Sequence, residues 1–135
     1  MNIIIVGAGL IGSSFVGLAL EENHQVTAIE KNEEKARSLL QKYDIKVLNA
    51  DIAQGDILKE AHVERADIIV ATTGDDSVNL MAMFLGKEQG VKNLITLINN
   101  RQHQSMFERL GVKVVVSPED IIAQQLYDFL GLSED

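Results

Sequence analysis

The chain has 135 residues, enough for one domain with an ordinary core but too few for an additional substrate-binding domain. Its net charge of −8 argues against a nucleic-acid partner and against an anionic membrane surface, because both need a basic patch. The sequence has no cysteine, which excludes disulfides, and no apolar run of the about 18 residues needed for direct membrane insertion.

Short β-rich runs alternate with helical patterns along the whole chain. Strands are predicted at residues 3–6, 26–29, 46–48, 68–71, 94–98 and 113–116, and helices at about 10–21, 33–43, 56–62, 76–90, 101–110 and 119–130. Because the strands are continuously apolar, we expect them to be parallel and joined by right-handed crossovers. The predicted fold class is α/β: residues 1–135 form a single Rossmann-like domain. It is a doubly wound six-stranded parallel sheet of order 3-2-1-4-5-6 with helices on both faces.

The first predicted strand passes into its helix through the glycine spacing G-x-G-x-x-G. Gly7 permits the tight turn, Gly9 lets a phosphate approach the backbone, and Gly12 lets the helix pack closely on its strand. The N–H groups at the helix start can then bind a pyrophosphate. The predicted cofactor-binding residues of this loop are Gly7, Ala8, Gly9, Leu10, Ile11 and Gly12.

Acidic residues follow the second and third strands. Glu30 stands eighteen positions after Gly12, where a carboxylate accepts hydrogen bonds from both ribose hydroxyls and repels a 2′-phosphate, so NADP is disfavoured. Lys31 is a candidate for ribose or phosphate contacts, although a solvated surface lysine is the favoured interpretation. Asp51 and the backbone of Ile52 are placed to bind the adenine edge. A turn or cap role for Asp51 is weighed equally.

Polar residues also follow the fourth and fifth strands. Thr72, Thr73, Gly74 and Asn79 are predicted to offer hydroxyls and amides opposite the glycine loop, where the far part of a nucleotide would lie. Arg101 is predicted to clamp a phosphate, or equally to pair with an acid on a neighbouring helix.

The remaining ionisable residues do not form a recognisable catalytic or metal site. Asp75 and Asp76 admit a paired-carboxylate or metal interpretation, but acids in a first helical turn more often complement the helix dipole. His24, His62 and His103 lie far apart without ligand spacing or a nearby acid, which makes metal binding unexpected. The Tyr-x-x-x-Lys pair of short-chain dehydrogenases is absent as well.

Two further segments are informative about the second half of the chain. The run from Leu80 to Leu85 is apolar around the helix, so it is expected to supply core residues and, in excess, an oligomer face. The last helix is predicted to start at Ser117-Pro118-Glu119-Asp120, with serine as N-cap and proline in the first turn.

Taken together, the chain resembles the regulatory nucleotide-binding domain of Trk/Ktr potassium uptake systems, also known as the RCK N-terminal (KTN, TrkA-N) domain. The resemblance covers residues 1–130. The motifs that carry it are Ile3-Ile4-Ile5-Val6-Gly7-Ala8-Gly9 with Gly12, Glu30-Lys31-Asn32-Glu33, Ala71-Thr72-Thr73-Gly74-Asp75-Asp76 with Asn79, and Val115-Val116-Ser117-Pro118-Glu119.

This resemblance implies a nucleotide sensor rather than an enzyme. The implied cofactor is NAD or NADH, alternatively AMP, ADP or ATP. The implied partners are a second copy in a homodimer or higher ring and a potassium-translocating membrane subunit, which would hold the domain at the cytoplasmic face of the membrane. Leu10 stands where many family members carry arginine, which favours NAD(H) or AMP over ATP. The C-terminal RCK lobe is expected to be absent.

Two other function classes remain open from the sequence. One is a small NAD-dependent oxidoreductase or a fragment of one, which turnover of NADH would reveal. The other is a structural scaffold with a vestigial site, which a lack of nucleotide binding would reveal.

Overall fold

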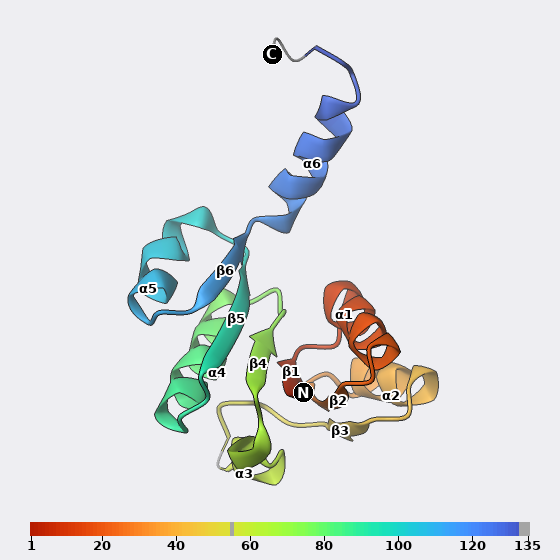
Figure 1. Ribbon diagram of the computed structural model, residues 1–135, viewed down its shortest axis with the longest axis vertical. Helices are drawn as coiled ribbons and strands as arrows, with labels where there is room; N and C mark the ends of the chain where they lie inside the picture. The colour runs from red at the N-terminus through yellow and green to blue at the C-terminus, as the bar shows by residue number, and fades with distance from the viewer. Residues whose placement is uncertain (55, 133–135) are drawn as a thin grey trace.

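The β-branched runs of the sequence assemble into one parallel sheet in the computed structural model, which describes residues 1–54 and 56–132 (Figure 1). Its strands are β1 (Asn2–Val6), β2 (Gln25–Ile29), β3 (Lys46–Leu48), β4 (Ile68–Ala71), β5 (Asn93–Ile98) and β6 (Lys113–Val116). Their order is β3-β2-β1-β4-β5-β6, so the predicted fold class and strand order are confirmed.

Helices connect successive strands as the alternating pattern predicts. They are α1 (Leu10–Glu21), α2 (Glu33–Lys42), α3 (Ile57–Glu60), α4 (Asp76–Glu88), α5 (Gln104–Arg109) and α6 (Pro118–Asp128), with 3₁₀ helices η1 (Val63–Arg65) and η2 (Arg101–His103). The helix expected at 56–62 is shorter than predicted, because His62 has a left-handed backbone with φ 58° that separates α3 from η1. The helix expected at 101–110 is divided between η2 and α5. Within the described residues, no helix is long and apolar enough to cross a bilayer.

Each face of the sheet has its own aliphatic core, because successive strand side chains point to opposite faces. Ile5 packs with Val16 of α1 and Leu39 of α2 on one face. On the other face, the core residues that surround Ile69 include Met83 of α4 and Phe107 of α5. The chain therefore covers β1 from both sides, which fixes the glycine loop that follows this strand.

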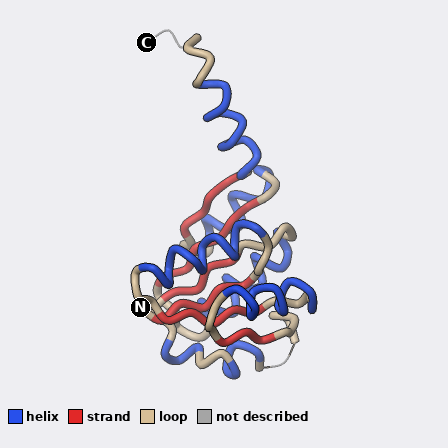
Figure 2. The backbone as a smooth tube through the Cα atoms, turned by 90° about the vertical axis from the view of Figure 1, so that its right-hand side faces the viewer, coloured by secondary structure: helices blue, strands red, loops and turns tan. Residues whose placement is uncertain are grey.

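The last helix does not cover either face. Figure 2 shows α6 projecting away from the sheet, and none of its residues is buried. The prediction that the Ser117 side chain caps α6 is wrong. Ser117 has a left-handed backbone with φ 49°, whereas a capping side chain needs an extended one. Its carbonyl oxygen instead accepts from the N–H groups of Asp120 and Ile121 at 2.9 and 3.2 Å.

Candidate nucleotide-binding site

The glycine loop makes a tight turn between β1 and α1. Gly7 has φ +110°, a conformation that other residues rarely adopt. A Cβ atom on Gly12 would collide with the Gly7 carbonyl oxygen and lie 2.8 Å from the Thr72 hydroxyl, so Gly12 permits α1 to pack directly on the loop. A Cβ on Gly9 would meet no described atom within 4 Å. Gly9 therefore borders open space, as a residue next to a phosphate must.

The N-terminus of α1 is open to a ligand. Gly9 is its N-cap residue and provides no side-chain cap. The first N–H groups of any helix, here those of Leu10, Ile11 and Gly12, have no acceptor inside the helix. By contrast, Asn32 caps α2 and Asp75 caps α4 through their side chains. The start of α1 can thus bind a phosphate through backbone N–H groups and the helix dipole.

Glu30 connects the end of β2 to the glycine loop. One carboxylate oxygen accepts from the Ala8 N–H at 2.6 Å, and the other accepts from the Asn32 N–H at 2.8 Å. Two carboxylate oxygens offer about four lone pairs, so both still have acceptor capacity for a ribose diol. Glu30 therefore orders the loop in addition to the ribose role that the sequence predicts.

Residues after β2 and β3 lie next to Glu30. The Lys31 ammonium is 3.6 Å from the Asp51 carboxylate, and its side chain is largely exposed. Asp51 also accepts from the Ala53 N–H at 2.9 Å, which is the turn role weighed in the sequence analysis. The side chain of Ile52 belongs to the core, so only its backbone remains for adenine recognition.

The segment after β4 lies opposite the glycine loop. The Thr72 hydroxyl is 3.4 Å from the Gly7 carbonyl oxygen, and Gly74 borders open space. Asn79 accepts from the Thr73 N–H and hydroxyl at 3.1 and 2.6 Å. Its amide donates to the carbonyls of Thr73 and Leu97, both at 3.0 Å. Asn79 is 0% exposed, which corrects its prediction as a contact residue: it positions Thr73.

Asp76 is a buried carboxylate that joins α4 to the end of β5. It accepts from the N–H groups of Asn99 and Asn100 at 2.7 and 2.9 Å, and His103 Nδ1 lies 2.7 Å away. Burial raises the pKa of Asp76, but the hydrogen bonds from Asn99, His103 and Asn100 outweigh it and hold the pKa below its ordinary value. The expectation that no acid lies near the histidines is therefore wrong. Asp75 caps α4.

Arg101 lies farther along this edge of the sheet. Its guanidinium is 3.3 Å from the Asp120 carboxylate on α6, the ion-pair alternative of the sequence analysis. Within residues 1–54 and 56–132, no group of three or more His, Asp or Glu side chains could hold a metal ion.

Two residues beside the site are not indicated by the sequence pattern. The Asn49 side-chain amide donates to the backbone carbonyls of Glu30 and Lys31 at 2.9 and 3.1 Å, and so fixes the segment that carries the ribose acid. Lys35 lines a groove between α1 and α2 that also includes Gly9 and Leu10. A lone asparagine after a strand and a lysine in a helix carry no sequence signal for these roles.

The strand order brings the main parts of the site together. Val6 of β1 lies beside Ile29 of β2 and Ala71 of β4, so the residues that follow them converge at one edge of the sheet. These residues are the glycine loop, Glu30 and the Thr72–Gly74 segment. An open helix N-terminus beside an acid suits the pyrophosphate or phosphate and the ribose of an adenine nucleotide.

Comparisons with known proteins identify the family of this chain. Residues 3–118 match the model of the TrkA-N domain family. The Trk system potassium uptake protein TrkA homolog of Methanothermobacter thermautotrophicus is 31% identical over 126 residues, which cover 93% of this chain and 58% of that protein. The Trk system potassium uptake protein TrkA of Halomonas elongata is 35% identical over 119 residues, 87% of this chain and 26% of that protein.

Two solved structures share the fold. The GsuK channel bound to NAD superposes with a TM-score of 0.75 at 20% identity, over 84% of this chain and 21% of that chain. The Shewanella denitrificans Kef CTD in AMP-bound form superposes with a TM-score of 0.79 at 18% identity, over 100% of this chain and 84% of that chain. On the match over residues 3–118, this chain belongs to the TrkA-N domain family.

Proposed function

We propose that this chain is a regulatory nucleotide-binding domain of a potassium uptake system, and that it binds NAD or NADH, alternatively AMP, ADP or ATP. The observation that carries the proposal is the open N-terminus of α1 at Gly9, with the Glu30 carboxylate beside it. The relatives named for potassium uptake and the fold neighbours bound to NAD and AMP support it.

The partner is proposed to be a potassium-translocating membrane subunit, with this chain at the cytoplasmic face. The chain spans 58% and 26% of the length of the two curated relatives described above. The activity of those longer proteins is therefore part of the proposal. A nucleotide can control such a partner only if it binds two arrangements of the assembly with different affinity. No reaction is required of the bound nucleotide.

The second copy in a homodimer or higher ring is proposed to cover α6. This helix projects from the sheet, and Ile122, Leu126 and Tyr127 are each more than half exposed. Val115 of β6, the strand that precedes this helix, is 47% exposed, and none of the residues of α6 is buried against the sheet. Exposed apolar side chains gathered on one projecting helix are typical of an interaction site in a folded protein.

Calorimetric titration tests the nucleotide site, using protein first freed of bound nucleotide. NAD, NADH, AMP, ADP and ATP are titrated into the wild type and into Glu30→Arg. The substitution removes the ribose acceptor and adds a bulky cation. We expect it to weaken the preferred nucleotide about tenfold or more, because each 1.4 kcal/mol of binding free energy is a factor of ten. The matched control is Glu21→Arg, which makes the same charge change at the far end of α1.

Three outcomes would contradict the proposal. No detectable binding of any of the five nucleotides would favour a scaffold with a vestigial site. Equal affinity of wild type and Glu30→Arg would place the nucleotide elsewhere. Turnover of NADH with a carbonyl substrate would favour the oxidoreductase alternative.

A further inference from the structure

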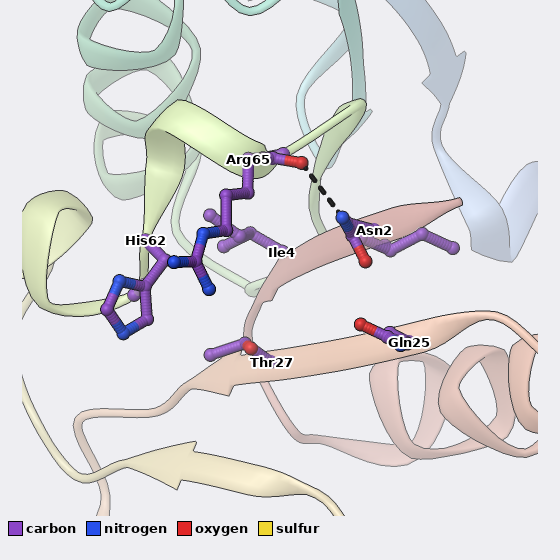
Figure 3. Close-up of a pocket in the computed structure, with 9 residues that line it drawn as sticks. Asn2, Ile4, Gln25, Thr27, His62 and Arg65 are labelled. Atoms are coloured by element: carbon purple, nitrogen blue, oxygen red, sulfur yellow. Dashed lines mark hydrogen bonds between the residues drawn. The ribbon is translucent and has the colours of Figure 1, made fainter.

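A cavity of about 130 Å³ opens at the end of the sheet opposite the glycine loop (Figure 3). It lies where β1 and β2 begin, between these strands and the segment from α3 to η1. Ile4 and Ala61 form an apolar lining and are both buried. Pockets for drug-sized ligands start at about 300 Å³, so this cavity has room for a small molecule or ion but not for a nucleotide.

Three polar side chains that line this cavity have no protein partner in the described part of the chain. Among the described residues, the Arg65 guanidinium forms neither an ion pair nor a hydrogen bond, and the Thr27 hydroxyl and Gln25 amide also lack hydrogen-bond partners. The Asn2 amide donates to the Arg65 backbone carbonyl at 3.1 Å and thereby fixes η1 against β1 (Figure 3). The base of the Arg65 side chain is therefore held at the rim of the cavity.

Arg65 is the one permanently charged side chain among the described residues that line the cavity. Figure 3 shows the Arg65 guanidinium beside the His62 ring and above Thr27. Lys46 is paired with Thr27 across β2 and β3, and its ammonium donates to the Glu60 carbonyl at 2.9 Å. Two acids lie outside the lining: the exposed Glu64 carboxylate is 3.4 Å from His62 Nδ1, and the Asp67 carboxylate accepts from the Asn2 N–H at 2.7 Å.

We propose that this cavity binds a small oxyanion, either phosphate or the carboxylate of a small acid, with Arg65 as its main ligand. The planar guanidinium presents two parallel N–H donors that match two oxygens of such an anion. Thr27 and Gln25 supply further donors from β2, and the apolar lining shields one side of the anion from water. The site is separate from the glycine loop, so its occupation does not depend on Gly9 or Glu30.

Nuclear magnetic resonance titration of the isotope-labelled full chain tests this site. Inorganic phosphate and acetate are added separately at constant ionic strength, with sodium chloride as the compensating salt. We expect saturable shifts of the backbone amides of Thr27, Ala61 and Ala66 with at least one anion, and the anion that binds more tightly identifies the ligand class. Arg65→Gln should weaken binding about tenfold or more, since it removes a charge-assisted hydrogen-bond pair.

The control variant is Arg37→Gln, which makes the same charge change on α2 and should leave the affinity unchanged. Glu64→Gln should strengthen binding, because it removes the acid that competes for His62. Thr27→Val tests the site independently of the charge and should weaken binding. Shifts that rise linearly with concentration for both anions, or that saturate equally in Arg65→Gln, would overturn the proposal. Nucleotide titration of Arg65→Gln measures binding at the glycine loop separately. The proposal of an anion site and the proposal of a nucleotide site can therefore be refuted independently.

Discussion

The close packing of α1 on the glycine loop predicts a large effect of the substitution Gly12→Ala. The added Cβ would collide with the Gly7 carbonyl oxygen and lie 3.0 Å from the Gly7 carbonyl carbon and 2.8 Å from the Thr72 hydroxyl. Two of these three contacts are with backbone, which cannot rotate away as a side chain can. The helix must therefore move off its strand or the loop must deform.

The magnitude follows from two opposing terms. Overpacking in a tight site costs about 1–3 kcal/mol and occasionally more, and backbone contacts place Gly12→Ala at the upper end. Alanine recovers at most about 1 kcal/mol of helix propensity over glycine. The net loss in free energy of unfolding is about 2 kcal/mol. For a chain of this size each kcal/mol corresponds to about 4 °C, so the melting temperature should fall by about 8 °C.

The matched substitution is Gly9→Ala in the same loop. A Cβ at Gly9 meets no described atom within 4 Å, and its φ of −73° suits any residue. Its stability should stay within about 1 kcal/mol of wild type. Nucleotide affinity should nevertheless fall about tenfold or more, because the methyl group occupies the approach of the phosphate.

Urea unfolding followed by circular dichroism measures the stability of both variants, and calorimetry measures their binding. Equal stability of Gly12→Ala and wild type would refute the packing argument. Wild-type nucleotide affinity in Gly9→Ala would refute the placement of the phosphate at the start of α1.

Two further predictions concern the buried carboxylate and the projecting helix. Asp76→Asn should lower the free energy of unfolding by about 2 kcal/mol at pH 7, because it breaks charge-assisted hydrogen bonds to Asn99 and Asn100. Since the pKa of Asp76 is lower in the folded protein than its ordinary value of 3.8, this contribution is complete above pH 3.8 and is lost as the pH falls through the folded pKa. Urea unfolding at acid and neutral pH should show the gap between variant and wild type closing in acid; a constant gap would contradict the assignment. Leu126→Asp on α6 should convert an assembled wild type to monomers in sedimentation velocity while the far-ultraviolet circular dichroism spectrum stays that of the folded chain, because Leu126 is exposed in the single chain. An unchanged sedimentation profile would remove α6 from the interface.

The fold could be predicted because its determinants are local. Each strand is a short apolar run, each crossover contains a helical pattern, and parallel strands joined in this way admit few topologies. The glycine loop could be predicted as well. The turn at Gly7 and the close contact at Gly12 both require a residue without a Cβ atom, and only glycine lacks one. The divided helices at 56–62 and 101–110 were not predicted, because single residues such as His62 take backbone conformations that tertiary packing selects.

The supporting residues of the site could not be predicted for a different reason. Asp76 lies 23 positions from Asn99 and 27 from His103, so only the pairing of β4 with β5 brings them together. The pattern of Thr73 and Asn79 predicts polar groups beside the glycine loop, and the structure places this segment opposite that loop. The sequence pattern does not distinguish an asparagine that contacts a ligand from one whose side chain already forms four hydrogen bonds within the protein, as Asn79 does.

The contact between Glu30 and Ala8 links nucleotide binding to the geometry of the loop. The same carboxylate accepts from the Ala8 N–H and is the proposed acceptor for the ribose diol. A ribose that draws one carboxylate oxygen toward its hydroxyls changes the hydrogen bond that holds the start of the loop. Asn49 restrains the backbone of Glu30, so the side chain and the loop must absorb the adjustment. The first structural response to a nucleotide should therefore occur between β2 and α1. Such a response would give the nucleotide different affinities for two arrangements of the loop, which is what a regulatory ligand requires.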